Sequence, residues 1–321
     1  MLSSRDLLLS IDKEIIQLNS NLQKMASAKH PILYAAAEHL FSAGGKKIRP
    51  AIILLIAQAT CKSISPEHQR LAEITEIIHT ASLVHDDVID DCDTRRGINT
   101  VHNIFSTKIA VLAGDFLFAQ SSWYLANLNN LEVVKIISKV IKDFAEGEVR
   151  QGLASFNTTI SIENYIEKSF YKTATLLACS CKATAILSDC CIKTQNNFYL
   201  YGKHLGLAFQ IMDDILDITS MKDTLGKPAG SDLKNGNLTA PLIFALEENP
   251  QLYLLINQEC QTTKNVNTAI AIIKNTKGIQ KAKDLAAEHI QLAIQIIQQI
   301  NQHKNTQSLV LMSYYILNRM N

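Results

Sequence analysis

The sequence predicts an all-α protein, a single-domain bundle of roughly ten or more mostly antiparallel helices around a central cavity, spanning residues 1–321. The composition supports this prediction, because 47% of the residues are hydrophobic and 19% are charged, a balance typical of a globular protein with an ample core. Helix breakers are scarce, with 12 glycines and 6 prolines. Apolar residues recur at three- and four-residue spacing in long stretches, and no linker-like stretch divides the chain.

The first stretch, residues 1–42, has an apolar stripe that predicts one or two amphipathic helices engaged in packing or in a subunit contact: Leu8, Ile11, Ile15, Leu18 and Leu22. Its Asp6 and Asp12 in a helical pattern are unlike a signal peptide or a transit peptide.

Charge, cysteine content and apolar run length narrow the class of protein. A net charge of +1 argues against a nucleic-acid surface. The seven cysteines are odd in number and lack zinc-site spacing, so we interpret them as small, reduced core residues in a reducing compartment. No apolar run approaches the roughly 20 residues of a membrane helix. We therefore expect a soluble protein.

An acidic cluster follows the apolar helical pattern of residues 74–88. Asp86 and Asp90 are four residues apart and share a helix face, with Asp87 beside them. Carboxylates packed this closely repel each other unless a positive group lies among them. Clusters of carboxylate oxygens suit Mg²⁺, which leaves its other positions to water and substrate phosphates.

The same spacing recurs at Asp213, Asp214 and Asp217, again at the end of an apolar helical run. One such cluster is consistent with a solvated helix end. Two copies with identical spacing, each at the end of an apolar helix, argue against that interpretation. We infer that the two helices face each other and that six carboxylates hold several Mg²⁺ ions, with a strongly anionic ligand such as a diphosphate among them.

A glycine-rich turn with cations precedes another apolar helix: Gly44-Gly45-Lys46-Lys47-Ile48-Arg49-Pro50. Pro50 is acceptable in the first turn of that helix. A glycine turn, clustered cations and a nearby helix N-terminus together indicate an anion site.

These motifs resemble those of the trans-prenyltransferases, the head-to-tail isoprenyl diphosphate synthases, from about residue 30 to residue 245. The resemblance is strongest to the solanesyl diphosphate synthase type of cyanobacteria and plastids, through residues 116–128, 130–134 and 229–246. It implies the isoprenoid synthase fold, a homodimer, and three Mg²⁺ ions per site. Both acidic motifs would be catalytic and would ligate these ions, through Asp86, Asp87, Asp90, Asp213, Asp214 and Asp217.

The resemblance also implies the substrate contacts. Isopentenyl diphosphate would be bound by Lys46, Lys47, Arg49, His79 and Arg96. The allylic diphosphate would be bound by Arg95, Lys172 (which would also be catalytic), Thr173 and Lys227, with Gln210 touching substrate. Asp232 would contribute to the metal–water shell. Gln151 is a weaker candidate, and we expect Asp115, Glu146 and Glu148 to be buried residues that hydrogen-bond between helices.

The chain departs from the family pattern in a loop that resembles the active-site flap, residues 226–241. Many relatives have Gly-Lys-x-Thr-Leu-Pro where this chain has Gly236-Asn237-Leu238-Thr239-Ala240-Pro241. A cation of the general pattern is therefore missing at Asn237.

The expected reaction adds isopentenyl units to an allylic diphosphate in the trans configuration, with an apolar tunnel for the growing chain. Ala81 and Ser82, just over one turn before Asp86, are small and leave the tunnel open. We expect an octaprenyl to nonaprenyl product for a quinone side chain such as that of plastoquinone. Our hypothesis for the residue at the tunnel floor is Phe144. The enzyme would work in a plastid stroma or a bacterial cytoplasm, with a possible peripheral membrane contact for product release.

Three other readings compete with this one. A di-iron four-helix protein is suggested by Glu76-x-x-His79, but no second such motif is found. A terpene cyclase would lack the glycine-rich basic turn and the second acidic motif. A non-catalytic subunit of a heteromeric prenyl diphosphate synthase is the main alternative, although both acidic motifs are intact here.

Overall fold

The structure is a computed structural model. It describes residues 9–42, 44–61, 63–219, 230–258, 260, 262–300 and 306–318. Lys227 and the first part of the flap-like loop lie outside these described residues.

The prediction of an all-α fold is confirmed, since the described part of the chain is helical except for one short hairpin. In that hairpin β1 (Thr94–Arg95) pairs antiparallel with β2 (Ile98–Asn99), so that Thr94 lies opposite Asn99 and Arg95 opposite Ile98. The chain forms two compact units. Unit 1 comprises residues 1–141, 176–202 and 295–312, and unit 2 comprises 142–175, 203–294 and 313–321.

Unit 1 contains η1 (Leu9–Ile11), α2 (Asp12–Met25), α3 (Pro31–Ser42), α4 (Ile48–Thr60), α5 (Pro66–Ile89), α6 (Val101–Ile104) and α7 (Thr107–Ala126). The helices that contribute residues to both units are α8 (Leu131–Leu153), α10 (Thr175–Leu187), α11 (Ile192–Thr219), α17 (Gly278–Gln299) and α18 (Gln307–Leu317). Unit 2 contains α9 (Ile162–Ser169), the π-helical turn η2 (Phe170–Ala174), α13 (Ser231–Lys234), α14 (Ala240–Leu246), α15 (Gln251–Asn257) and α16 (Thr263–Lys274).

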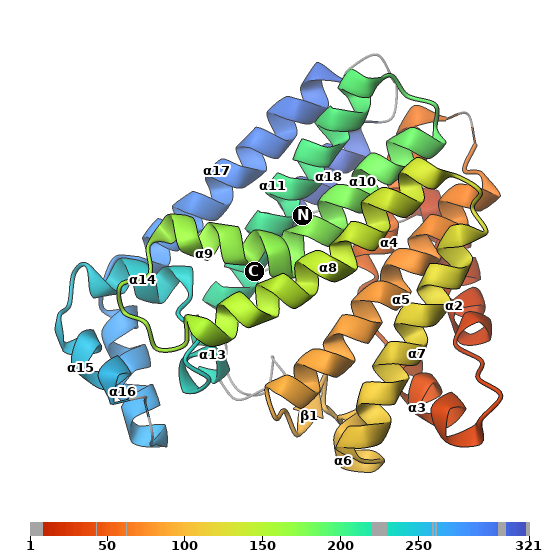
Figure 1. The fold of residues 1–321 in the computed structure, drawn as a ribbon. Helices are drawn as coiled ribbons and strands as arrows, with labels where there is room; N and C mark the ends of the chain where they lie inside the picture. The colour runs from red at the N-terminus through yellow and green to blue at the C-terminus, as the bar shows by residue number, and fades with distance from the viewer. Residues whose placement is uncertain are drawn as a thin grey trace. The chain divides into compact units, whose positions relative to one another are not determined.

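The helix that carries the first acidic motif, α5, has a well-defined start and end. A capping box at Ser65 and His68 begins it, with Pro66 in the first turn, where its missing N–H costs nothing. The helix ends at Ile89, and Asp90 is its C-cap. In Figure 1, α5 lies between α4 and α7, and it packs against both. This packing places the acidic motif at the last turn of a buried helix.

Among the described helices, α7 is the one whose length and apolarity would suffice to cross a membrane, and 33% of its most apolar window is buried. The buried residues form a stripe at helical spacing: Ala110, Ala113, Gly114, Leu117, Ser121 and Leu125. On its other side the helix exposes Val111, Leu112 and Trp123 to 38%, 44% and 64%. One face of α7 therefore packs in unit 1, and an apolar strip of the other face is uncovered in the single chain.

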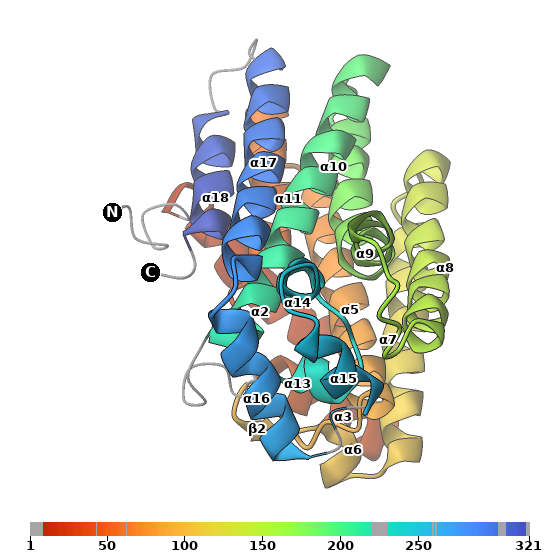
Figure 2. The ribbon, with the colours of Figure 1, turned by 90° about the vertical axis from the view of Figure 1, so that its left-hand side faces the viewer.

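The core of unit 2 forms around the second acidic helix and the short helices that follow it. Ile211 and Ile215 of α11 are fully buried in one cluster with Leu242 of α14 and Ile256 of α15. Figure 2 shows α14, α15 and α16 gathered together, and these three helices contact one another. The part of α11 that carries the acidic motif is thereby fixed in position, because the apolar residues on the other faces of this helix are packed in the core.

The cysteines are only partly as expected. None of the seven forms a disulfide, and Cys179, Cys181 and Cys260 are buried. Cys191, however, is exposed, because it lies immediately before α11, outside the buried helical stretch in which it was expected.

Candidate active site

The glycine-rich turn brings Lys47 into a partly buried ion pair in unit 1. The Lys47 ammonium lies 3.0 Å from the Glu76 carboxylate of α5, and both side chains are about nine-tenths buried. Lys47 is the N-cap of α4 and adopts a left-handed conformation (φ 48°). Lys46 is exposed. Of the two adjacent lysines, Lys47 is therefore the one directed inward, and sequence reasoning did not single out Glu76 as its partner.

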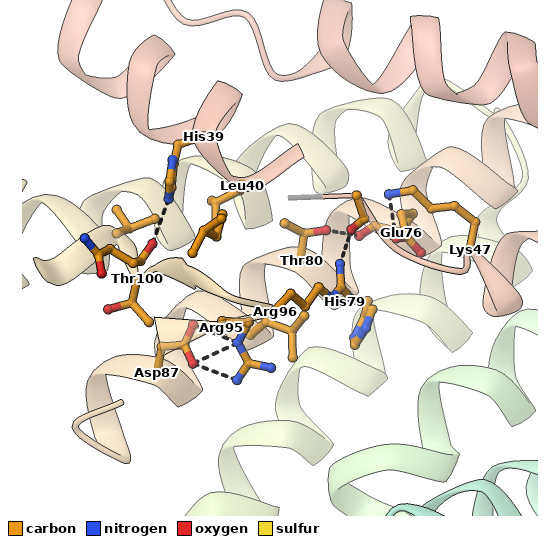
Figure 3. A pocket seen from close by; sticks show the side chains of 15 residues that line it. His39, Leu40, Lys47, Glu76, His79, Thr80, Asp87, Arg95, Arg96 and Thr100 are labelled. Atoms are coloured by element: carbon orange, nitrogen blue, oxygen red, sulfur yellow. Dashed lines mark hydrogen bonds and ion pairs between the residues drawn. The ribbon is translucent and has the colours of Figure 1, made fainter. Parts of the chain in front are cut away.

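His79 lines the same pocket as Lys47, Arg95 and Arg96 (Figure 3). A guanidinium N–H of Arg49 donates to His79 Nε2 at 3.0 Å. Burial and the nearby charges of Arg49, Arg96, Arg95 and Lys47, in decreasing order, lower the pKa of His79 well below its usual range. His79 is therefore neutral at physiological pH, which allows its ring nitrogen to accept the hydrogen bond from Arg49.

Arg95 and Asp87 form the most extensive ion pair of this pocket. Arg95 Nε lies 2.8 Å from both Asp87 carboxylate oxygens, and Arg95 Nη2 lies 2.7 Å from Oδ1. Asp87 is only 4% exposed. Because the β1–β2 hairpin folds Arg95 back over the end of α5, the cation expected among the carboxylates is present. It satisfies the oxygens of Asp87, whereas Asp86 and Asp90 are less buried.

Arg96 explains why the turn before α4 contains glycines. Its guanidinium donates to the backbone oxygen of Gly44. A Cβ on Gly45, whose φ is 156°, would lie 2.7 Å from Arg96 Nη1. Glycine at position 45 therefore allows the positive φ of the turn and leaves space for the Arg96 side chain. His79, Arg95 and Arg96 line one pocket, and Arg49 contacts His79.

The pocket that His79, Arg95 and Arg96 line is small. It encloses about 30 Å³, which holds one or two water molecules. Its lining includes Lys47, His79, Arg95 and Arg96, together with Glu76 and Asp87. An entering diphosphate would have to replace these carboxylates as the partner of the cations.

The second acidic motif lies in unit 2, on α11. Asp214 is 3% exposed and accepts hydrogen bonds from Tyr165 Oη at 2.6 Å and from Gln210 Nε2 at 2.7 Å. Burial, reinforced by the nearby Asp232, raises the pKa of Asp214 well above its usual range. Asp213 and Asp217 are less buried. Both motifs therefore bury their second carboxylate and leave the first and third nearer to the surface.

Lys172 and Thr173 lie in the π-helical turn η2, a local widening that is frequent at functional sites. Lys172 Nζ lies 2.7 Å from the Glu148 carboxylate and donates to Gln151 Oε1 at 3.3 Å. Thr173 Oγ1 donates to Gln210 Oε1 at 2.6 Å. Thr173 and Gln210 are thus linked to Asp214, and the weaker candidate Gln151 contacts Lys172.

The segment after the second motif adds residues that the sequence did not predict. Ser231 Oγ donates to Asp217 Oδ1 at 3.1 Å, and Asn237 Nδ2 donates to Asp232 Oδ1 at 3.2 Å. Lys168 of α9 donates to the Asn237 side-chain oxygen. No local sequence signal distinguished Lys168 from a solvated lysine, and Tyr165 likewise carried none.

Two predictions about polar helix residues are wrong. The Asp115 side chain is 63% exposed, because it lies on the face of α7 that does not pack in unit 1. Glu146 is 42% exposed and pairs with Lys142 on its own helix. Glu148 is less exposed, but its partner is Lys172 of the predicted site. The di-iron reading is also disfavoured, because Glu76 and His79 face cations, which repel a metal ion.

The residues present fit Mg²⁺ as an ion shared with a phosphate ligand. Within the described residues, no group of three His, Cys, Asp or Glu side chains could hold a metal ion unaided. Mg²⁺ commonly takes only one or two protein carboxylates and completes its shell with water and phosphate oxygens. The pairs Asp86/Asp90 and Asp213/Asp217, each spaced by one helical turn, match that requirement.

A helical chain with two such acidic motifs, each beside cations, has the features of an enzyme that acts on diphosphates. The chain belongs to the polyprenyl synthetase family, whose model matches residues 30–273, and it is a trans-prenyltransferase. The expected resemblance and enzyme class are confirmed.

Individual relatives are similar over most or all of this chain. A prenyl transferase of Porphyra purpurea is 57% identical over 322 residues, covering 100% of both chains. The chloroplastic solanesyl diphosphate synthase 2 of Arabidopsis thaliana is 51% identical, covering 88% of this chain and 69% of the relative. The crystal structure of a polyprenyl synthase from Caulobacter crescentus CB15, complexed with calcium and isoprenyl diphosphate, has a TM-score of 0.94 and 30% identity, covering 99% and 98% of the two chains.

Proposed function

We propose that this trans-prenyltransferase depends on Mg²⁺ and makes a long-chain all-trans polyprenyl diphosphate, octaprenyl to nonaprenyl, from isopentenyl diphosphate and an allylic diphosphate. The observation that carries the proposal is the pair of acidic motifs, each with its second carboxylate buried and its first and third carboxylates only partly buried. The chloroplastic relative named a solanesyl diphosphate synthase supports the long product.

The residues of unit 1 would bind the non-allylic substrate. Arg49, Arg96 and the Lys47 ammonium offer charge-assisted donors to a diphosphate, and neutral His79 adds a ring nitrogen. Lys46, exposed beside them, would contribute from the solvent side. Arg95, with its planar fork, would bind the allylic diphosphate while it holds Asp87.

The residues of unit 2 would bind and orient the allylic diphosphate. Lys172 would exchange Glu148 for phosphate oxygens, and Thr173 and Gln210 would keep Asp214 in place. Bound Mg²⁺, three ions by family resemblance, would offset the negative charge of the departing diphosphate. Asp86, Asp87, Asp90, Asp213, Asp214 and Asp217 are the proposed ligand set, in which Asp87 and Asp214 act from buried, donor-held positions.

The proposed reaction begins with loss of diphosphate from the allylic substrate, which leaves a resonance-stabilised carbocation. The double bond of isopentenyl diphosphate attacks this cation to form the new carbon–carbon bond. A proton is then lost to the departed diphosphate, and the lengthened diphosphate is the next allylic substrate. The cations around the diphosphates stabilise the leaving group, which is the main contribution of these residues to the rate.

The apolar face of α7 supports a homodimer. Val111, Leu112 and Trp123 form an exposed strip beside the buried one, and their aromatic and aliphatic area is the kind that a second copy would cover. Light scattering should give twice the chain mass for the wild type and the monomer mass for Trp123→Glu. A monomeric wild type would contradict this part of the proposal.

The setting follows from the relatives, which come from a red alga and a chloroplast. We infer a plastid stroma or a bacterial cytoplasm of the cyanobacterial type, a quinone side chain such as that of plastoquinone as the destination, and a peripheral membrane contact during product release.

The test is incubation of purified protein with labelled isopentenyl diphosphate, Mg²⁺ and farnesyl or geranylgeranyl diphosphate, followed by sizing of the extracted prenyl alcohols. Octaprenyl to nonaprenyl products that disappear on chelation of Mg²⁺ are expected. Products of three or four units would contradict the long-chain proposal. No incorporation by folded protein would favour the alternative, a non-catalytic subunit of a heteromeric prenyl diphosphate synthase.

A further inference from the structure

Lys168 is a buried cation that the substrate contacts described above do not use. It lies on α9 in unit 2 and is 9% exposed. Its ammonium donates to the side-chain oxygen of Asn237 and, at 3.4 Å, to the backbone oxygen of Leu238. Both acceptors are neutral. A buried ammonium costs free energy unless opposite charge compensates it, so its charge must act on groups beyond these two contacts.

The opposite charge comes from the second acidic site. Burial lowers the pKa of Lys168, whereas Asp214 and Asp232, the two strongest charge partners, raise it; Lys172 lowers it and Glu148 raises it. Asp214 is itself buried, and Asp232 raises its pKa. The geometry agrees, because Lys168 Nζ lies 5.7 Å from the centroid of the Tyr165 ring, and Tyr165 Oη donates to Asp214 at 2.6 Å. Lys168 therefore lies beside the group that holds Asp214.

Asn237 connects the ammonium to one of these carboxylates. Its side-chain oxygen accepts from Lys168, and its side-chain nitrogen donates to Asp232 Oδ1 at 3.2 Å. Its backbone N–H also donates to the Asp232 backbone oxygen at 2.8 Å. The amide thus passes the polarisation of the ammonium to the carboxylate while it carries no charge itself.

The same residue, Asn237, is where the chain lacks the lysine that the family pattern has. A lysine there would place its own ammonium beside Asp232 and would conflict with Lys168 at close range. In this chain the positive charge instead comes from Lys168 of α9, and Asn237 connects it to Asp232 by hydrogen bonds.

We propose that Lys168, acting through Asn237, is the positioning residue that supplies the cation missing at position 237 and holds Asp214 and Asp232 in place before the metal–diphosphate ligand binds. This inference rests on the proposed function. It assigns a cation to the second acidic site that is separate from Lys172, whose partners are Glu148 and Gln151.

The test moves the charge. Lys168→Met should lower kcat/KM for the allylic diphosphate about 10- to 100-fold, and Lys168→Met/Asn237→Lys should recover it to within about fivefold of wild type. The matched control, Lys168→Met/Asn237→Met, has the same truncation without a cation and should not recover. Wild-type activity in Lys168→Met, or equal activity of the two double variants, would overturn the proposal.

A second readout does not depend on turnover. Without Mg²⁺, the melting temperature of Lys168→Met should fall below that of wild type, because the carboxylates repel without their cation. Mg²⁺ should narrow this difference, and Asn237→Lys should narrow it without Mg²⁺. If neither Mg²⁺ nor Asn237→Lys changes the difference in melting temperature, Lys168 has only a structural role, and the proposal is overturned. Inactive wild-type protein with these melting shifts would overturn the proposed function alone.

Discussion

At the scale of single residues, the two acidic motifs share a division of labour. Asp87 is held by Arg95, and Asp214 is held by Tyr165 and Gln210. Buried carboxylates require such donors, since an unpaired buried charge costs several kcal/mol, on the order of 3–5 when one partner is removed. The first and third carboxylates of each motif are less buried and lie one helical turn apart.

Arg95 should not be replaceable by lysine. Arg95→Lys retains the charge but loses the fork that meets both Asp87 oxygens, so we expect kcat/KM to fall about 10- to 100-fold. Arg150→Lys is the control, because Arg150 forms an exposed pair with Glu167 that contributes little. Steady-state kinetics with both substrates measures the effect. Equal kinetics for the two variants would show that bidentate geometry at Arg95 is unnecessary.

Gly45 should be sensitive to a single added methyl group. In Gly45→Ala the new Cβ would meet Arg96 at 2.7 Å in a backbone conformation (φ 156°) that alanine disfavours. We expect the KM for isopentenyl diphosphate to rise about tenfold, with a smaller change for the allylic substrate. Gly152→Ala, where a Cβ meets nothing within 4 Å, is the control and should be silent. A silent Gly45→Ala would contradict the placement of Arg96.

At the scale of elements, the sequence was sufficient to predict the features that depend on the local spacing of apolar and acidic residues. The apolar repeat and the acidic end of α5 were sufficient to predict that helix and the clustering of Asp86, Asp87 and Asp90. The hairpin that follows, with Arg95 in its first strand, was not predicted. The π-helical turn at Lys172 was not predictable, since its Phe-Tyr-Lys-Thr-Ala sequence is ordinary for an α-helix. Its last residue packs closely on Gly206 of α11, where a Cβ would lie 2.7 Å from Ala174 Cα, a contact between segments distant in the sequence.

Contacts between distant elements account for the residues that sequence reasoning missed. Tyr165 and Lys168 lie on α9, and their partners Asp214 and Asn237 are 49 and 69 positions further along the chain. A lysine in a helix is ordinarily solvated, and only the fold brings α9 to α11 and to the Asn237 loop. Helical periodicity contains no information on such pairings.

A histidine pair between α11 and α17 should make the protein acid-sensitive. His204 Nδ1 and His289 Nδ1 are 3.0 Å apart. Burial, then His289, lowers the pKa of His204 to about 4, and burial and Lys203 lower the pKa of His289. Since unfolded histidine titrates near about 6.5, the unfolded state takes up protons first. The stability that this pair contributes is therefore complete above that pH and is lost as pH falls toward 4.

Unfolding by urea at about pH 7 and about pH 5 should show a loss of about 1–2 kcal/mol from this pair, discounted for its partial exposure. His204→Gln removes one titrating ring and should make the pH dependence shallower. Replacing the exposed His30 by Gln is the control and should leave the slope unchanged. An unchanged slope in His204→Gln would mean that other groups cause the acid sensitivity.

At the scale of the whole molecule, the length of the product should report on space along α5. Ala81 is fully buried and Ser82 is partly buried, one turn before the first acidic motif. A phenyl ring there should block a chain that grows along the helix, so Ala81→Phe should shorten the main product by several isoprene units while the first condensation persists. Phe144 remains the proposed floor for the unblocked chain.

The experiment must distinguish a block of the growing prenyl chain from a loss of protein stability. Because Ala81 has no exposed surface, a larger side chain strains its neighbours, at a cost of about 1–3 kcal/mol. Ser82→Phe places the same ring at a less buried position, and Ala126→Phe adds it at an exposed site near the end of α7 as the control. Shorter products from both α5 variants and a full-length product from the control are expected. Full-length product from folded Ala81→Phe and Ser82→Phe would place the growing chain elsewhere, since a phenyl ring on its path must stop it.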